Sequence, residues 1–340
     1  MRRLDIAAQY HASAPLRLDL AGGWTDVPPF SAREGGVVVN AAIRLAARVE
    51  LALGGDLIRL ESLDLEQTVE CATSAGLVLD GRLDLLKAGL RMFPVVGNLT
   101  LTTRSEAPIG SGLGSSGALD VALVACLVAA RQERIDRAEL AHHAWHLEVH
   151  EAGIPGGRQD QLAAALGGFH RLTFRDPDVG IEPITLDAAF VQALEQQVVL
   201  CYTGQSRVSG ETIARVMAAY ERGDRQVTGA LREMKDVALA MAEALRAADL
   251  GRVGELLARN WRCQQALDGA MQTPGMAALE AAMRDVHVLG GKAAGSGAGG
   301  SMFFIAGDGG RVATATAAAA REAGATLLPV AWSFEGGHAW

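Results

Sequence analysis

The sequence has few cysteines, no long apolar run and no cluster of basic residues. Its four cysteines lie far apart among 340 residues, which excludes a zinc knuckle and a CxxC redox pair. The longest apolar stretch, residues 117–130, contains Asp120 and is shorter than the ~20 residues that a membrane span needs. The first residues lack the apolar segment of a signal peptide. We therefore expect a cytoplasmic protein with reduced thiols and no membrane partner.

Charge and composition further limit the kinds of protein that this sequence can encode. The net charge is −8 and Lys and Arg form no run, which argues against nucleic acid as a partner. Hydrophobic residues make up 49% of the chain and charged residues 21%, which excludes a disordered protein. At about 150 residues per domain, the length predicts two domains.

The order of the expected elements indicates an α+β fold. Alternating apolar and polar residues predict strands near 16–20, 37–39, 47–53, 57–60 and 99–103. Residues 116–131 are apolar all round and predict a buried helix, followed by helices over 136–152 and 159–165. A strand over 198–202, helices over 211–259 and strands near 302–306 and 327–332 complete a second, mixed part. Strands followed by helices favour the α+β class over a doubly wound sheet.

Many of the 40 glycines are clustered, and the most informative cluster precedes the buried helix. Residues 108–117 read PIGSGLGSSG. Free N–H groups and a partial positive charge at a helix start, together with glycines and hydroxyls, suit a phosphate group. A glycine turn with a serine cap is the plainer alternative, although paired serines and three alternating glycines exceed what a cap requires.

Two other nucleotide-binding motifs fit the chain less well. A Walker A loop is absent, because Gly291 and Lys292 are followed by Ala293 instead of Ser or Thr. Gly112, Gly114 and Gly117 fit GxGxxG, but residues 98–105 alternate instead of forming the apolar strand of a Rossmann unit. A second helix also follows the first where that fold needs a strand.

Three segments together resemble the GHMP kinases, named after galactokinase, homoserine kinase, mevalonate kinase and phosphomevalonate kinase. They are residues 14–26 (APLRLDLAGGWTD), 108–116 and 295–300 (GSGAGG). Residues 21–29 (AGGWTDVPP) and 156–161 (GGRQDQ) are most similar to sugar anomeric kinases that act on D-glycero-D-manno-heptose 7-phosphate or L-fucose. The resemblance implies an N-terminal domain like ribosomal protein S5 domain 2 over 1–190 and a ferredoxin-like C-terminal domain over 191–340.

The sequence departs from the family pattern at three positions. Gly117 stands where an Ala usually follows the serine pair, and Ala298 interrupts the third glycine run. Trp24 stands where galactokinases carry His, which argues against galactose as the substrate.

The resemblance also implies roles for individual residues, with ATP and Mg²⁺ as the nucleotide and metal. Asp160 would be the base for the acceptor hydroxyl or would orient it, and Arg17 would stabilise Asp160 and the phosphoryl charge. Ser116 and Glu148 would hold Mg²⁺. ATP would bind Pro108, Gly110, Ser111, Gly112, Leu113, Gly114, Ser115 and Ser116. The substrate would bind Trp24, Thr25, Asp26, Gly156, Gly157, Arg158, Gln159 and Gly297.

Each of these residues also has a purely structural interpretation. Asp160 stands at an expected helix start, where a carboxylate caps or complements the helix dipole. Arg17 could lie on a solvated strand face, and residues 24–26 could form a β-turn. Glu148 falls in an apolar helical stripe, where carboxylates are rare unless they are paired or bind a metal. Glu151 is the competing metal ligand.

Four histidines on the same expected helix invite a zinc hypothesis. His142, His146 and His150 recur every four residues, so successive side chains rotate by about 40° and three converge poorly on one ion. The HExxH motif is absent as well. A solvated polar face is the preferred interpretation.

The sequence thus predicts an ATP-dependent kinase that phosphorylates the C1 hydroxyl of a sugar. Arg158 could meet a substrate phosphate, which favours D-glycero-D-manno-heptose 7-phosphate over L-fucose. A catalytically silent sugar- and ATP-binding regulator is the alternative of another class, and a homodimer is compatible with the sequence.

Overall fold

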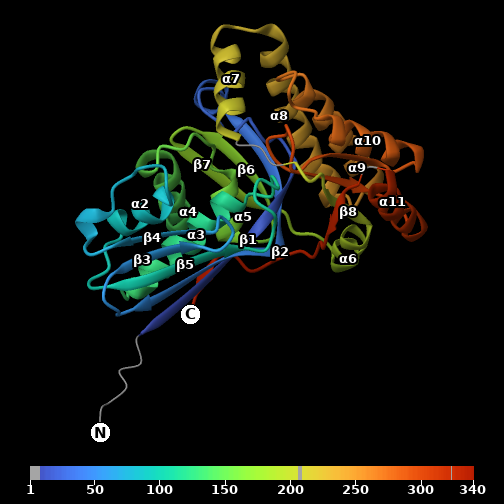
Figure 1. Ribbon diagram of the computed structural model, residues 1–340. Coiled ribbons are helices and arrows are strands. Elements are labelled where there is room, and N and C mark those ends of the chain that lie inside the picture. The colour runs from blue at the N-terminus through green and yellow to red at the C-terminus, as the bar shows by residue number, and fades with distance from the viewer. Residues whose placement is uncertain (1–7, 206–208, 323) are drawn as a thin grey trace.

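The structure is a computed structural model that describes residues 8–205, 209–322 and 324–340 (Figure 1). The larger of two sheets is built mainly from the first half of the chain. Its strands are β1 (Gln9–Ala21), β2 (Gly36–Leu53), β3 (Ile58–Ser62), β4 (Gln67–Cys71), β5 (Leu99–Ser105), β6 (Phe169–Arg175), β7 (Asp178–Pro183) and β12 (His338–Ala339).

The long strand β2 organises this sheet. The main path runs β12-β1-β2-β5-β3-β4, and β6 and β7 extend from the first half of β2. Residues 36–41 of β2 pair with β6, whereas residues 47–53 pair with β5. Every residue from 36 to 43 is buried, and since successive strand residues point to opposite faces, this part of the sheet is covered on both sides.

Helices from both halves of the chain provide that cover. The first-half helices are α1 (Phe30–Glu34), α2 (Asp84–Met92), α3 (Ser115–Ala130), α4 (Arg137–His146) and α5 (Gln159–Leu166), with a short 3-10 turn at Ser74–Gly76 and a π-helical turn at Leu147–Glu151. Both α3 and α5 pack on β1 and β2, as does α8 from the second half. The apolar sequence of α3 is thereby explained, because 11 of its 16 residues are buried.

The second half forms a smaller antiparallel sheet with order β11-β8-β10-β9. Its strands are β8 (Val198–Tyr202), β9 (Gly290–Ala293), β10 (Ser301–Ile305) and β11 (Thr326–Leu328). The helices are α6 (Ala188–Gln197), α7 (Ser209–Glu221), α8 (Arg225–Arg246), α9 (Leu250–Gln265), α10 (Pro274–Asp285) and α11 (Gly309–Glu322). The end of the chain then returns to the large sheet, where β12 pairs with β1.

The expected α+β class and most expected strands are confirmed, and the differences are local. The helix expected over 136–152 changes to a π-helical turn at Leu147. The helical region expected over 211–259 contains a break where Ala248 has a φ of 53° and Asp249 caps α9. The last expected strand ends at Leu328. A domain boundary near residue 190 stays a proposal.

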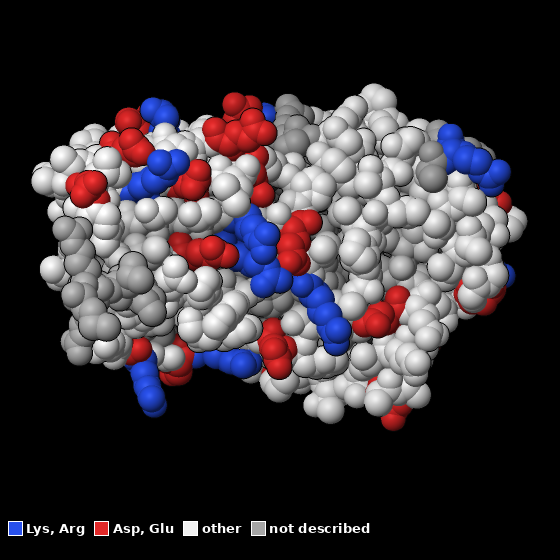
Figure 2. All heavy atoms as spheres, turned by 60° about the horizontal axis from the view of Figure 1, so that its bottom comes forward, with Lys and Arg blue, Asp and Glu red and all other residues white. Residues whose placement is uncertain are grey.

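The helices and the surface charge bear on possible partners. In the described part of the chain, no helix is both long enough and apolar enough to cross a membrane. On the face shown in Figure 2, Lys and Arg side chains alternate with Asp and Glu, and acidic groups border the central basic group. Charge on this face is therefore mixed rather than of one sign.

Candidate active site

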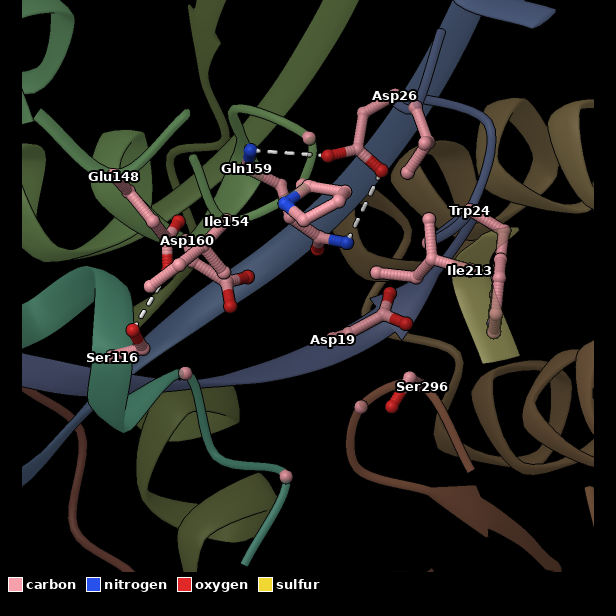
Figure 3. A pocket seen from close by; sticks show the side chains of 18 of the residues that line it. Asp19, Trp24, Asp26, Ser116, Glu148, Ile154, Gln159, Asp160, Ile213 and Ser296 are labelled. Atoms are coloured by element: carbon pink, nitrogen blue, oxygen red, sulfur yellow. Dashed lines mark hydrogen bonds between the residues drawn. The ribbon is translucent and has the colours of Figure 1, made fainter. Parts of the chain in front are cut away.

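A cavity of about 550 Å³ lies where the two halves of the chain meet (Figure 3). Its wall combines the end of β1, the loop before α3, the segment that leads into α5, one residue of α7 and the glycine loop after β9. The described lining residues are Arg17, Asp19, Gly23, Trp24, Asp26, Val27, Gly110, Ser111, Gly112, Gly114, Ser115, Ser116, Glu148, Gly153, Ile154, Pro155, Gly156, Gly157, Gln159, Asp160, Ile213, Gly295 and Ser296.

The glycine loop reaches the cavity with backbone that only glycine adopts easily. Gly110, Gly112 and Gly114 have φ values of 68°, 74° and 74°. The loop also touches the third glycine run, since a Cβ at Gly295 would lie 2.4 Å from the Gly112 carbonyl oxygen. Helix α3 begins directly after this loop, so its free N–H groups face the cavity.

Two buried hydroxyls of the same loop lack an internal partner. Among the described residues, nothing hydrogen-bonds the Oγ atoms of Ser111 and Ser115. Buried polar groups in folded proteins are nearly always satisfied, so these hydroxyls indicate a polar ligand. Loop, helix start and hydroxyls together make an anion-binding cradle.

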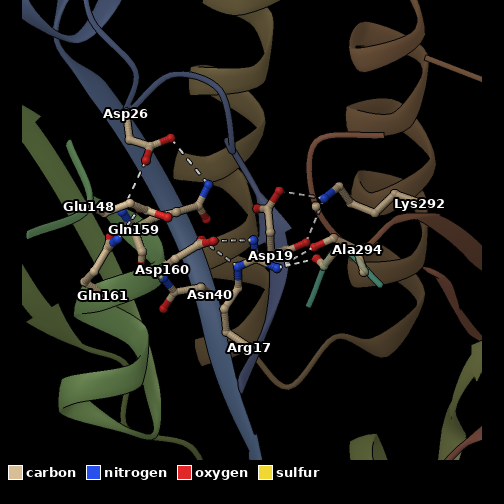
Figure 4. A network of polar contacts seen from close by, with 12 residues as sticks. Arg17, Asp19, Asp26, Asn40, Glu148, Gln159, Asp160, Gln161, Lys292 and Ala294 are labelled. Carbon is tan, nitrogen blue, oxygen red and sulfur yellow. Dashed lines mark hydrogen bonds and ion pairs between the residues drawn. The ribbon is translucent and has the colours of Figure 1, made fainter. Parts of the chain in front are cut away.

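Arg17 and Asp160 form a bidentate ion pair at the cavity wall (Figure 4). Arg17 Nε donates to Asp160 Oδ1 at 2.9 Å, and Nη2 donates to Oδ2 at 3.0 Å. Nη1 of the same guanidinium donates to the carbonyl oxygens of Gly112 and Ala294 at 2.6 and 3.0 Å. Arg17 thus ties the carboxylate to both glycine loops, and β1 and α5 bring together two residues that are remote in sequence.

Glu148 and Ser116 also meet at the cavity. Ser116 Oγ donates to Glu148 Oε1 at 2.6 Å, and Gln161 Nε2 donates to Oε2 at 2.6 Å. Burial raises the pKa of Glu148 to about 6, although the Ser116 hydrogen bond opposes this shift. Glu151, in contrast, is not part of the described lining, and its carboxylate lies 4.0 Å from His146 Nδ1.

One further buried carboxyl lies behind this pair. Asp120 stands one turn after Ser116 in α3 and has no exposed surface. Burial first, and then the charge of Glu148, raise the pKa of Asp120 well above its ordinary value. The neutral form is therefore favoured over a wider pH range than for an exposed carboxyl, because a buried charge is costly.

Asp26 occupies the opposite side of the cavity. Its Oδ2 accepts a hydrogen bond from the Gln159 backbone N–H at 3.2 Å, and its Oδ1 accepts one from Gln159 Nε2 at 3.4 Å. Gly157 permits this approach, since a Cβ there would lie 1.8 Å from Oδ2. Burial, and then the charge of Asp160, raise the pKa of Asp26 to about 6.

Several residues expected in the site do not line the described cavity. Thr25 is fully buried, and its hydroxyl bonds the carbonyl oxygens of Gly22 and Val37, so its role is to hold the turn. Leu113 is buried too, with its carbonyl accepting from the Arg17 backbone N–H at 2.9 Å. Pro108 and Gly297 also lie outside the lining.

Arg158 is also absent from the described lining. Its guanidinium donates to Asp176 and to the carbonyl oxygen of Pro177, and it lies over the rings of Trp145 and Phe174. Burial lowers the pKa of Arg158. The side chain is therefore engaged with groups outside the described lining, and a role of Arg158 toward a substrate phosphate stays a prediction.

The structure adds lining residues that the sequence pattern did not single out. Asp19 lies within an expected strand and was not singled out there. Ile154 and Ile213 are apolar, and no sequence motif marks them as site residues. Ser296 lies inside the third glycine run and could have been included from that motif. As for zinc, no three His, Cys, Asp or Glu side chains group as metal ligands in the described ranges.

Comparisons with known proteins agree with this architecture. The GHMP kinases N terminal domain matches residues 81–168, and the GHMP kinases C terminal domain matches residues 241–326. A D-glycero-alpha-D-manno-heptose 7-phosphate kinase from Campylobacter jejuni is 31% identical over 300 residues, which cover 86% of this chain and 87% of the relative. The chain belongs to the GHMP kinase family.

Further relatives support the same class. An L-fucokinase/L-fucose-1-P guanylyltransferase from Bacteroides fragilis is 28% identical over 327 residues, 87% of this chain and 34% of that longer protein. The crystal structure of a D-glycero-D-manno-heptose 1-phosphate kinase from Bacteroides thetaiotaomicron superimposes with a TM-score of 0.79 at 26% identity, covering 97% of this chain and 98% of the other. The protein is an ATP-dependent phosphotransferase with the two-domain GHMP kinase fold, as its sequence predicted.

Proposed function

We propose that this kinase transfers the γ-phosphoryl group of ATP to the anomeric C1 hydroxyl of a sugar, D-glycero-D-manno-heptose 7-phosphate. The observation that carries the proposal is the Arg17–Asp160 pair, which lines the same cavity as the glycine loop at the start of α3. The name of the Campylobacter jejuni relative, a D-glycero-alpha-D-manno-heptose 7-phosphate kinase, supports the choice of acceptor.

In this proposal the ATP phosphates bind the cradle before α3. The N–H groups at the helix start and the hydroxyls of Ser111 and Ser115 supply the donors. These groups meet negative charge with fixed dipoles, so little reorganisation is needed as the phosphoryl group moves.

Asp160 then receives or orients the acceptor hydroxyl. The C1 oxygen forms a bond to the γ-phosphorus, the bond to the bridging oxygen breaks, ADP leaves, and the hydroxyl proton passes to Asp160. Each carboxylate oxygen that Arg17 engages keeps a second lone pair for that hydroxyl. Positioning supplies most of the catalysis in such a transfer, and Arg17 fixes the carboxylate in place.

A magnesium ion fits the oxygen donors of Ser116 and Glu148. Mg²⁺ takes one or two carboxylates together with substrate phosphates, and Glu148 lines the cavity beside the phosphate cradle. Bound there, the ion would neutralise phosphate charge. Without the ion, the hydrogen bond of 2.6 Å that Ser116 Oγ donates holds it next to Glu148 Oε1.

Polar groups on the other wall suit the sugar. Asp26 and Gln159 present acceptors and donors to the cavity, and the indole N–H of Trp24 is buried with no partner among the described residues. Trp24 itself has a φ of 83°, so the turn holds this ring in an uncommon backbone conformation. We assign sugar binding to these residues and to Gly156 and Gly157.

L-Fucose is the second candidate acceptor. It is favoured by one observation: Arg158, the expected partner of a substrate phosphate, donates to Asp176 instead. The fucokinase relative matches 87% of this chain, so both acceptors have a named counterpart.

Release of ADP over a panel of acceptors tests the proposal. D-glycero-D-manno-heptose 7-phosphate, L-fucose, D-mannose, D-galactose and mevalonate would be compared at equal concentration with ATP and Mg²⁺. We expect the heptose phosphate to give the highest kcat/KM. Turnover of mevalonate alone would contradict a sugar kinase, and thermal stabilisation by sugar without ADP release would indicate a regulator.

A further inference from the structure

The carboxylate of Asp19 lines the cavity, yet the proposed phosphoryl transfer does not use it. Asp19 lies near the end of β1, where the residue is only 2% exposed. Its Oδ2 is fixed, whereas its Oδ1 has no hydrogen-bond partner among the described residues. Figure 3 shows this carboxylate among the labelled lining side chains, near Ile213 and Ser296.

Asp19 Oδ2 is held by a residue of the smaller sheet. Lys292, in β9, donates from Nζ to Asp19 Oδ2 at 2.8 Å and to the Asp19 backbone carbonyl at 2.7 Å. Lys292 is fully buried, and its ammonium lies 5.9 Å from the centre of the Phe303 ring. Figure 4 shows the lysine reaching across from the second half of the chain. The first contact holds Oδ2, and the second ties the same ammonium to the backbone of Asp19.

The turn after β1 leaves space for the Asp19 carboxylate because it has a glycine at position 23. A Cβ at Gly23 would lie 2.2 Å from Asp19 Oδ2 and 3.1 Å from Gln159 Nε2. Any side chain at Gly23 would therefore displace Asp19 or fill the cavity beside it. Glycine at this position leaves the acidic group at the wall.

An ion pair that served stability alone would have both oxygens satisfied. Burying a carboxylate oxygen without a hydrogen bond is costly, and buried charged pairs contribute little net stability compared with apolar packing. The costly arrangement makes sense if a ligand supplies the missing donor. A sugar is rich in hydroxyl donors, and a carboxylate is a strong acceptor for them.

We propose that Asp19 is a hydroxyl-binding residue of the acceptor-sugar site, with Oδ1 accepting a hydrogen bond from one sugar hydroxyl and Lys292 positioning the carboxylate through Oδ2. This inference rests on the proposed sugar-kinase function and adds a specificity-determining residue to it. The sugar site then includes residues from both sheets, because Lys292 belongs to the smaller one.

Deoxy sugars provide the test. D-glycero-D-manno-heptose 7-phosphate and its 2-deoxy, 3-deoxy and 4-deoxy derivatives would be assayed with wild type and Asp19→Asn. A hydrogen bond to a charged group corresponds to roughly 10- to 150-fold in binding, so Asp19→Asn should lower kcat/KM for the full sugar by at least about tenfold. For one derivative, the one without the bound hydroxyl, wild type and variant should agree within about threefold. The KM for ATP should stay unchanged.

A structural role would give a different pattern. If Asp19→Asn reduced kcat/KM by the same factor for every derivative, or by no factor at all, the assignment would be overturned. Asp64→Asn is the matched control, because Asp64 is a partly buried carboxylate outside the described lining that accepts from the Ser105 backbone N–H at 2.7 Å. That control should leave the selectivity among deoxy sugars unchanged.

Two further comparisons keep the test decisive. Should Asp19→Asn fold poorly because Lys292 loses its counter-charge, the double variant Asp19→Asn/Lys292→Met removes both charges and should show the same selectivity pattern. A wild-type enzyme that turns over no sugar would overturn the proposed function as well. A wild type that discriminates among the deoxy sugars, with a variant that discriminates equally, would overturn the Asp19 assignment alone.

Discussion

The Arg17–Asp160 pair joins residues 143 positions apart through hydrogen bonds of 2.9 and 3.0 Å. We expect Asp160→Asn to lower kcat by about 10²-fold or more, because an amide cannot take the proton of the acceptor hydroxyl. The sugar KM should change little, since the interaction matters mainly in the transition state. Asp160→Ala should lose more, because orientation is lost too. Steady-state kinetics would measure both, and a folded Asp160→Asn enzyme with near wild-type kcat would contradict this role.

Asp26 should make the free protein less stable as the pH rises. Its pKa is raised from an ordinary 3.8 to about 6, so the folded state binds the proton more tightly than the unfolded state. The stability linked to Asp26 is complete below pH 3.8 and is lost as the pH rises through about 6. A two-unit shift corresponds to ~3 kcal/mol as an upper bound.

Replacing Asp26 with Asn removes this titration. We therefore expect Asp26→Asn to unfold at higher urea concentration than wild type at pH 8, with the difference shrinking toward pH 4. The same variant should show a raised KM for the sugar. Equal pH dependence of unfolding in the two proteins would show that the carboxylate is ionised at no cost.

At the residue scale, the sequence identifies the chemical type of a side chain better than the direction in which that side chain points. The motif around Thr25 predicted sugar binding for three adjacent residues, yet the Thr25 hydroxyl turns inward to two backbone carbonyls. Arg158 is a cation in a promising loop, but Asp176 lies close enough to bind it. Such outcomes depend on neighbours that are remote in sequence, and no spacing rule reveals them.

Glu148 and Glu151 both lie in the π-helical turn at Leu147–Glu151, but only Glu148 belongs to the described cavity lining. Glu148 is buried beside Ser116, whereas the side chain of Glu151 is 35% exposed near His146.

We expect Glu148→Gln to raise the Mg²⁺ concentration for half-maximal rate at least about tenfold, the lower range for groups that tune metal sites. The matched variant Glu151→Gln should keep the wild-type Mg²⁺ dependence. Titration of the rate with Mg²⁺ at saturating ATP compares them. The reverse pattern would assign the ion to Glu151 and make Glu148 structural.

Elements with strong periodicity or a uniform character were predictable, whereas short or mixed ones were not. The apolar sequence of α3 predicted a buried helix, and the structure places it between the large sheet and neighbouring helices. Helix α2 was not predicted although its nine residues are amphipathic, and β4 is only five residues long. The π turn continues directly from α4, so no sequence pattern indicated the change. Tertiary packing, not local preference, fixes these segments.

At the scale of the whole molecule, the end of the chain fastens the second half to the first. After β11, the backbone returns to the large sheet, where Trp332 bridges Ile43 and β12 pairs with β1. Trp332 is 2% exposed, and its ring lies 4.9 Å from that of Phe169. The sequence predicted a strand in this region but could not show that the strand partners lie near the N-terminus.

Trp332→Ala should therefore lower the free energy of unfolding by about 3–5 kcal/mol, as for other buried aromatic truncations. Phe334→Ala is the control, because Phe334 is 60% exposed and should change stability by no more than about 0.5 kcal/mol. Denaturant unfolding of both variants tests this. Equal, small effects would mean that the C-terminal segment adds nothing to the stability of the large sheet.

The two halves of the chain meet at the candidate active site, and the three motifs that lie far apart in sequence come together there. Arg17 bonds the carbonyl of Ala294 in the smaller-sheet half, and Gly112 contacts Gly295. Sequence motifs predicted that these segments share a site because their order resembles a known family. Their actual contacts required the folded chain.

The most direct test of the account is the identity of the phosphorylated product. The purified protein, ATP, Mg²⁺ and D-glycero-D-manno-heptose 7-phosphate would be followed by phosphorus NMR with proton coupling. The account predicts a new phosphate resonance coupled to the anomeric proton, formed with one ADP per product and strongly reduced for Asp160→Asn. A new phosphate coupled to any other proton of the sugar, or no sugar product while ATP and the sugar both bind, would contradict it.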